Sequence, residues 1–175
     1  MALWGAYGMA YAVLENSEIN FNPLDAVEQI AYANGWAVER QGDEEIVTEV
    51  STAVCTFRLW FAWRADCEAL HFTCAFDMKV AAPRRPSIYP LLALINERLW
   101  LGHFDMFSDE GMVVFRHAML LRGGGGATPE QMVDLVHASL AECERYYPAF
   151  QFVLWGGKSP EEAMAASILD TQGEA

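Results

Sequence analysis

The sequence predicts an α+β fold: an antiparallel meander sheet with helices packed on one of its faces. Two observations lead to this prediction. Apolar residues recur with a period of about 3.6 residues in some segments and with a period of two in the segments between them. The segments with a period of two follow one another with turn residues in between, as in a meander.

The first helix is expected within residues 21–36, "FNPLDAVEQIAYANGW". Asn22 can cap its N-terminus, Pro23 suits its first turn, and Asn34-Gly35 ends it. Beyond this point the period changes to two. A first hairpin is therefore expected from residues 36–40 and 45–50, joined by a turn at "QGDEE".

Two longer strands follow, in "VCTFRLWFAWR" and "ALHFTCAFDMKV". Apolar residues take the odd-numbered positions of the first strand and the even-numbered positions of the second. The residue numbers of partners in an antiparallel pair have a constant sum, and an odd sum lets the two apolar faces coincide. We therefore expect an even number of residues in the loop around "RADCE", or a β-bulge.

The second half of the chain predicts three more helices and two strands. A helix is expected in "PRRPSIYPLLALINERLWLG", with Gly102 as its stop signal. Strands near residues 103–107 and 112–121 come next, followed by a long helix from Pro129 to about Tyr147. A short helix begins at "SPEEAMAASIL".

The glycine run in "LLRGGGGATPEQM" suggests a phosphate-binding loop at first sight. Such a loop needs a lysine and a hydroxyl directly after its glycines, and this pair is absent. A dinucleotide-binding loop needs a parallel strand–helix unit, which an antiparallel meander does not provide. Thr128, Pro129 and Gln131 instead predict a capping box. The glycines are therefore interpreted as slack between a strand and a helix.

Composition and charge limit the classes of function. The chain has 175 residues, with 24 acidic and 11 basic side chains and a net charge of -13. This length fits one domain with a substantial core. The negative electrostatic field of such a chain repels phosphate backbones and anionic lipids. Neither a nucleic acid nor a membrane is therefore expected as a partner.

The ends of the chain are expected to lie outside the main domain. The first 14 residues, "MALWGAYGMAYAVL", are apolar, but no Lys or Arg precedes them as in a secretory signal. They are also too few for a membrane helix. The predicted organisation is an N-terminal arm over residues 1–20, one α+β domain over 21–156, and a C-terminal helix and tail over 157–175.

No catalytic, cofactor-binding or metal-binding residues are predicted, and we do not expect an enzyme. The four cysteines include no C-x-x-C pair, which favours reduced core residues of a cytoplasmic protein. The four histidines lack the spacing of a helical metal site, and there is no G-x-S-x-G motif. The acidic pairs fall in predicted turns, where solvated charge is the expected state.

The long hairpin carries a candidate protein-interaction surface. Its polar face brings Arg58 and Trp60 of one strand near His71 and Thr73 of the other. A tryptophan among small and polar residues suits an interface better than open water. The alternative is that a helix or the N-terminal arm of the same chain covers this face.

Several segments together resemble the YbjN family of bacterial sensory transduction regulators, in particular its alphaproteobacterial members. They include "NPLDAVEQIAYANGWAVER", "CTFRLWFAWR", "YPLLALINERLWLGHFD" and "YYPAFQFVLWGGKSPEEA", and the resemblance extends from about Phe21 to Ala166. It implies an α+β fold similar to that of type III secretion chaperones. It also implies a homodimer with no catalytic residues and no cofactor.

The sequence therefore favours a cytoplasmic, non-enzymatic, dimeric protein that holds an unknown protein partner on a sheet face. The alternative is a sensory regulator that binds a small ligand in a cleft lined by Trp60, Trp63 or Trp100 and signals through its dimer. A flat apolar face would favour the first function, and an enclosed pocket with convergent polar groups would favour the second.

Overall fold

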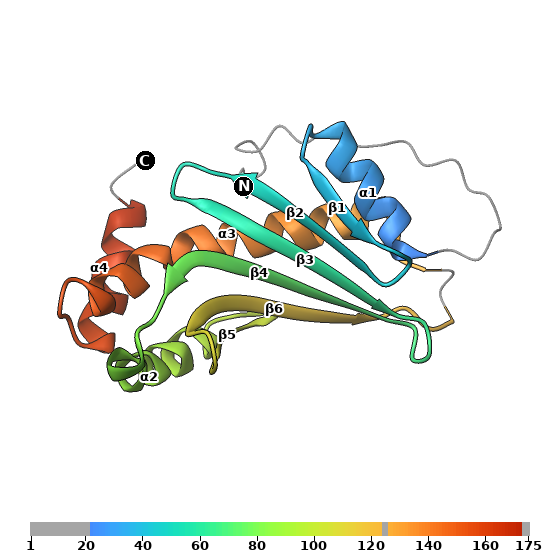
Figure 1. Cartoon of the computed structure of the whole chain (residues 1–175). Coiled ribbons are helices and arrows are strands. Elements are labelled where there is room, and N and C mark those ends of the chain that lie inside the picture. The colour runs from blue at the N-terminus through green and yellow to red at the C-terminus, as the bar shows by residue number, and fades with distance from the viewer. Residues whose placement is uncertain (1–21, 124–125, 173–175) are drawn as a thin grey trace.

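The computed structural model describes residues 22–123 and 126–172 of the chain (Figure 1). The predicted N-terminal arm and the end of the predicted tail lie outside the described residues. The elements follow in this order: α1 (Pro23–Ala33), β1 (Val38–Gln41), β2 (Glu45–Ser51), β3 (Thr56–Arg64), β4 (Ala69–Lys79), a 3-10 turn (Ala82–Arg84), α2 (Arg85–Asn96), β5 (His103–Phe107), β6 (Met112–Leu120), α3 (Pro129–Leu154) and α4 (Pro160–Gln172).

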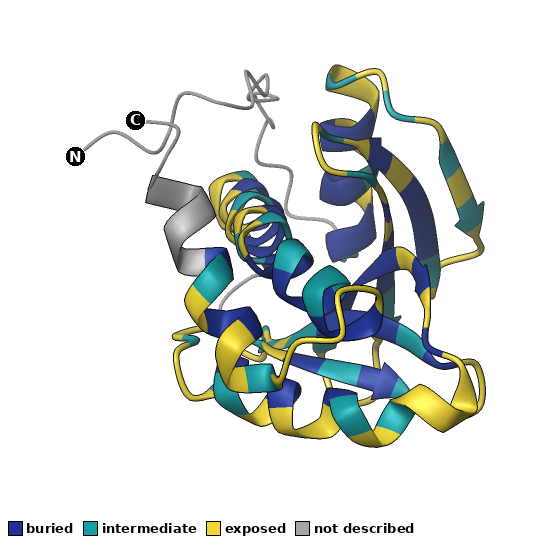
Figure 2. Ribbon diagram, turned by 90° about the vertical axis from the view of Figure 1, so that its left-hand side faces the viewer, coloured by how far each residue is buried: buried dark blue, intermediate teal, exposed yellow. Residues whose placement is uncertain are grey.

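The six described strands form one antiparallel sheet in the order β1-β2-β3-β4-β6-β5. Helices α1, α2 and α3 pack against one face of this sheet, and α4 packs on α2 and α3 (Figures 1 and 2). The predicted α+β class, the antiparallel sheet and the placing of the helices on one face are confirmed. The position of β6 between β4 and β5 is a feature that periodicity does not predict.

The register of the long hairpin is the one expected from its apolar pattern. Phe61 pairs with Phe72, so the residue numbers of partners sum to 133, an odd number. The last pair, Arg64 with Ala69, leaves the four residues 65–68 in the loop, an even number. The apolar side chains of β3 and β4 therefore share the face that the helices cover.

The capping signals act as the sequence predicts. The Asn22 side chain accepts a hydrogen bond from the Leu24 N–H at 3.0 Å. At the start of α3, the Gln131 N–H donates to the Thr128 hydroxyl at 3.2 Å, and the Thr128 N–H donates to the Gln131 side chain at 2.9 Å. These bonds satisfy N–H groups that a helix leaves without partners in its first turn.

Two helix ends differ from the prediction. Helix α3 does not end near Tyr147 but continues through Pro148 to Leu154, because the residues after Pro148 extend its buried stripe with Phe150 and Val153. Helix α2 ends at Asn96 and does not reach Gly102. Its last residue instead turns its side chain toward β5, as described below.

The core lies between the sheet and α3. Its centre is the ring of Phe76, which packs within 5.5 Å of the Tyr147 and Phe150 rings of α3 and within 5.9 Å of the Phe104 ring of β5. Helix α4 contributes Ala163, which is fully buried. Among the described helices, none has the length and apolarity needed to cross a membrane.

Candidate functional site

One face of the sheet is left uncovered by the described helices, and we call it the open face (Figure 2). Strand pairing sets its side chains in rows that cross the sheet. The central row runs through Val47, Trp60, Thr73, Arg116 and His103, each opposite the next on the neighbouring strand. The predicted surface residues therefore lie on the open face, together with residues of β5 and β6.

A shallow depression of about 180 Å³ lies in this face, lined by Trp60, Ala62, His71, Thr73 and Phe107. Trp60 is 42% exposed and forms one wall. Thr73 was expected at the surface, but it is buried at 4% exposure. The reason is its place in the row, where two much larger side chains stand beside it, so that Thr73 forms the floor of the depression.

The polar side chains beside the depression are held in place by one another. The guanidinium of Arg116 donates to the Asp105 carboxylate at 3.2 Å and lies 3.3 Å from Nε2 of His71. It also stacks over the Phe107 ring, 5.9 Å from the ring centre. Burial lowers the pKa of His71, and the nearby positive charge of Arg116 lowers it further. A neutral His71 can accept the Arg116 hydrogen bond at Nε2, which places its own proton on Nδ1.

The open face carries little of the molecule's negative charge. Its basic residues are Arg58, Arg64, Lys79 and Arg116, and its acidic residues are Glu39, Glu45, Glu49 and Asp105. Four positive and four negative charges give 0, against a net charge of -13 for the whole chain. An approaching acidic protein therefore meets little net repulsion from the residues of this face.

Of the three tryptophans named as candidates for a ligand cleft, Trp60 lines the depression, whereas Trp63 is partly buried against the core on the helix side of the sheet. Trp100 is 99% exposed in the segment between α2 and β5. Sequence reasoning also missed Asp105, Phe107 and Arg116, because only the strand order brings them to this site.

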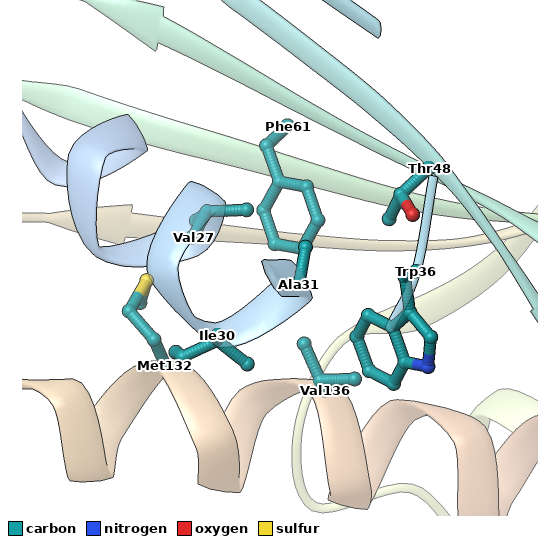
Figure 3. Close-up of a pocket in the computed structure, with 8 residues that line it drawn as sticks. All are labelled: Val27, Ile30, Ala31, Trp36, Thr48, Phe61, Met132 and Val136. Carbon is teal, nitrogen blue, oxygen red and sulfur yellow. The ribbon is translucent and has the colours of Figure 1, made fainter. Parts of the chain in front are cut away.

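A second cavity lies between α1, the sheet and α3, and Figure 3 shows the side chains that line it. Its volume is about 10 Å³, which is room for one water molecule. The lining is apolar except for Thr48, whose hydroxyl already donates to the carbonyl of Ala37 at 2.8 Å. This cavity is a small gap in the packing and provides no polar group for ligand recognition.

The cysteines of the core are poor nucleophiles. Burial raises the pKa of Cys55 to about 12 and raises that of Cys143 well above its usual range. A thiol reacts as its thiolate, which is scarce at neutral pH when the pKa is this high. Within the described part of the chain, no three histidine, cysteine or acidic side chains gather as metal ligands would.

These features define an α+β protein with one open sheet face, on which polar side chains hold one another in place and the net charge is near zero. The profile of the YbjN family, described as "Putative bacterial sensory transduction regulator", matches residues 23–152, and the chain belongs to this family. Among solved structures, the chain is similar to YbjN from E. coli, described as a putative transcription regulator, with 17% sequence identity and a TM-score of 0.49. That match covers 68% of this chain and 84% of the other. No curated protein matches the sequence.

Proposed function

We propose that this protein is a non-enzymatic regulator that binds a segment of another protein on the open face of its sheet. The observation that carries the proposal is the depression beside Trp60, which combines an exposed tryptophan, a phenylalanine and an ordered arginine on a face of low net charge. Tryptophan, tyrosine and arginine are the residues that dominate binding energy at protein interfaces.

The order of these side chains lowers the cost of binding. Arg116 is fixed by Asp105 on one side and by His71 on the other, and it lies over Phe107. Association costs less conformational entropy when the contact groups are already immobilised in the free protein. The same arrangement supports recognition of a segment whose apolar side chain fills the depression while its polar groups meet the rim.

A small ligand is the second candidate, because the depression could hold one. Its volume of about 180 Å³ is below the range of about 300–1,000 Å³ that is typical of sites for drug-sized ligands. The hollow is also open along the sheet, which suits a chain segment better than a ligand that must be enclosed. We therefore rank the protein partner first.

A pair of tryptophan variants tests the proposal. A photo-crosslinking amino acid placed at Trp60 should capture the partner from native lysate, and the same group at Trp155, at the end of α3, should not, although Trp155 is the more exposed of the two. With the captured partner purified, Trp60→Ala should weaken binding by at least about tenfold, whereas Trp155→Ala leaves it unchanged. Equal capture at both positions, or equal affinity of both variants, would count against the open face as the binding site.

The dimer that the family resemblance implies is part of the same proposal. Light scattering on the purified protein gives its mass in solution. A mass of about 39 kDa, twice that of the 19.6 kDa chain, would support the dimer, and a mass of one chain would exclude it. A shift of tryptophan fluorescence on addition of a small-molecule extract that is absent in Trp60→Ala, with no crosslinked protein, would favour the second candidate instead.

A further inference from the structure

Strand β6 extends beyond its neighbour β5. The two strands pair from Met112 to Arg116 of β6, where His103 is the last partner. The next four residues, 117–120, pair with β4 on one side. On their other side no described strand is present, so a lane one strand wide lies open beside this part of β6.

Two residues of this segment direct their backbone hydrogen-bonding groups into the open lane. The Leu121 N–H donates to the carbonyl of Glu68 at 2.8 Å, on the β4 side. Successive residues of a strand alternate in the direction of these groups, so Leu120 and Ala118 turn theirs away from β4. Both residues are exposed, and none of the described residues bonds to these groups.

The fold covers the corresponding groups of β5. The side chain of Asn96 accepts from the Phe104 N–H at 2.8 Å and donates to the Phe104 carbonyl at 3.0 Å, as a neighbouring strand would. The Met106 N–H donates to the Asp105 carboxylate at 2.8 Å. Side chains that cover an edge in this way prevent a further strand from pairing with it. Among the described residues, no side chain covers Ala118 and Leu120 in this way.

Exposed apolar side chains border the open lane. The chain leaves the lane at Gly102, whose φ of +64° turns it away, and whose added Cβ would lie 2.7 Å from the Arg116 carbonyl oxygen. Just before this glycine, Trp100 is 99% exposed and Leu101 is 58% exposed. Leu120 is 82% exposed on β6 itself. Large apolar groups beside unpaired backbone are typical of surfaces to which an extended peptide adds as a strand.

The charge next to the lane favours an occupant with acidic side chains. Arg122 follows the segment directly, and no described carboxylate lies within ion-pair distance of it. A second copy of this chain fits the lane poorly in the register that pairs Ala118 of one copy with Leu120 of the other. The constant sum of 238 would set Arg122 of the second copy opposite Arg116, at a place where His103 of β5 already pairs.

We infer that an extended segment of another protein, with alternating apolar and acidic residues, binds as an added antiparallel strand beside residues 117–120 of β6. This surface is separate from the depression around Trp60. The inference therefore does not depend on the proposed function, and each can be tested without the other. Backbone hydrogen bonds at Ala118 and Leu120 would provide the pairing, and Arg122 would select for carboxylates.

The test uses two synthetic peptides, Glu-Val-Glu-Val-Glu-Val-Glu and its lysine counterpart, with the full-length protein. The acidic peptide should slow hydrogen exchange of the Ala118 and Leu120 amides and bind more tightly than the lysine peptide. Ala118→Pro removes the outward N–H without breaking a bond to β4, and should weaken binding by at least about tenfold. Trp60→Ala is the matched control and should bind the acidic peptide as the wild type does.

A charge reversal keeps the test decisive if the proline variant folds poorly. Arg122→Glu should reverse the preference, so that the lysine peptide binds more tightly than the acidic one. Absence of protection at Ala118 and Leu120 up to millimolar peptide would overturn the inference. So would binding that neither Ala118→Pro nor Arg122→Glu changes. Protection of these amides that rises with protein concentration alone would show that the occupant is a second copy, and would overturn it as well.

Discussion

Gly102 shows how one residue shapes the surface beside β6. Its place after an apolar stripe predicts the stop signal of a helix, but the helix ends six residues earlier, at Asn96. Its actual role is steric. The backbone at Gly102 has a φ of +64° and passes so close to β6 that an added Cβ would lie 2.2 Å from the Phe115 ring. A pattern can mark such a glycine as special, but it does not reveal which of the two constraints, conformation or contact, applies.

A comparison of two glycines separates these constraints. Gly42 also has a positive φ, +60°, but nothing lies within 4 Å of its added Cβ. Gly42→Ala should therefore cost only the conformational term, about 1 kcal/mol of the free energy of unfolding. Gly102→Ala adds a clash with the Arg116 backbone and should cost about 3 kcal/mol or more. Urea unfolding of both variants measures the difference, and equal losses would contradict the contact.

The other predictions for single residues were right where the partner is near in the chain and wrong where it is far away. Asn22, Thr128 and Gln131 act through neighbours along the chain, and the sequence predicted their roles. The burial of Thr73 depends on a residue from β6, which is more than 40 positions away. Capping can be predicted from a single sequence because the partners are close in the chain. Packing across strands depends on the order of the strands in the sheet, which the sequence pattern does not predict.

At the scale of elements, the apolar pattern determined more than the identity of each strand. It also limited the register of β3 with β4 to an odd sum of partner numbers, since only this parity of the pairing buries both apolar faces. It did not determine that β6 lies between β4 and β5, and this arrangement brings Arg116 opposite Thr73. The alternation in β6 marked a strand, but any position in the sheet would have satisfied it. The apolar pattern therefore predicted the residues that β3 and β4 contribute to the site. The residues that β5 and β6 contribute could be found only from the order of the strands in the sheet.

Asn96 links α2 to β5 and gives a prediction at this scale. Its amide forms one hydrogen bond with the Phe104 N–H and another with the Phe104 carbonyl. Asn96→Ala leaves both groups without that partner in a partly buried place and should lower the free energy of unfolding by about 2 kcal/mol. Asn96→Asp keeps the acceptor for the N–H and loses the donor for the carbonyl, so it should fall between the alanine variant and the wild type.

Chemical denaturation measures the free energy of unfolding of the two variants and the wild type. Hydrogen exchange measures the protection of the Phe104 amide directly. The amide should exchange fastest in Asn96→Ala and remain protected in Asn96→Asp. If the two variants were equally stable and equally protected, the side chain would not be acting as a substitute strand.

For the whole molecule, the balance of charge connects stability with function. The net charge of -13 is spread over a chain that has 11 basic residues, and four of those bases lie on the open face. They balance the four acidic residues of that face, so the net negative charge belongs to the rest of the chain. The open face is therefore a place where contact with an acidic molecule meets little local repulsion. The cost of the net charge is repulsion between like charges within the folded chain.

That repulsion should make the protein more stable in salt. Charges on the surface are screened over about 10 Å at 0.1 M salt, so raising NaCl from about 10 mM to about 0.5 M should increase the thermal midpoint by a few degrees, roughly 1 kcal/mol for a chain of this size. Glu39, exposed on the edge strand β1 and without an ion pair to any described residue, provides the control. Glu39→Lys changes the net charge by two and should raise the midpoint at low salt while reducing the gain from added salt. A midpoint that falls on adding salt would mean that attractive pairs, such as Arg40 with Asp25 at 2.8 Å, outweigh the repulsion. Net charge would then be a poor guide to where an acidic partner can approach the protein.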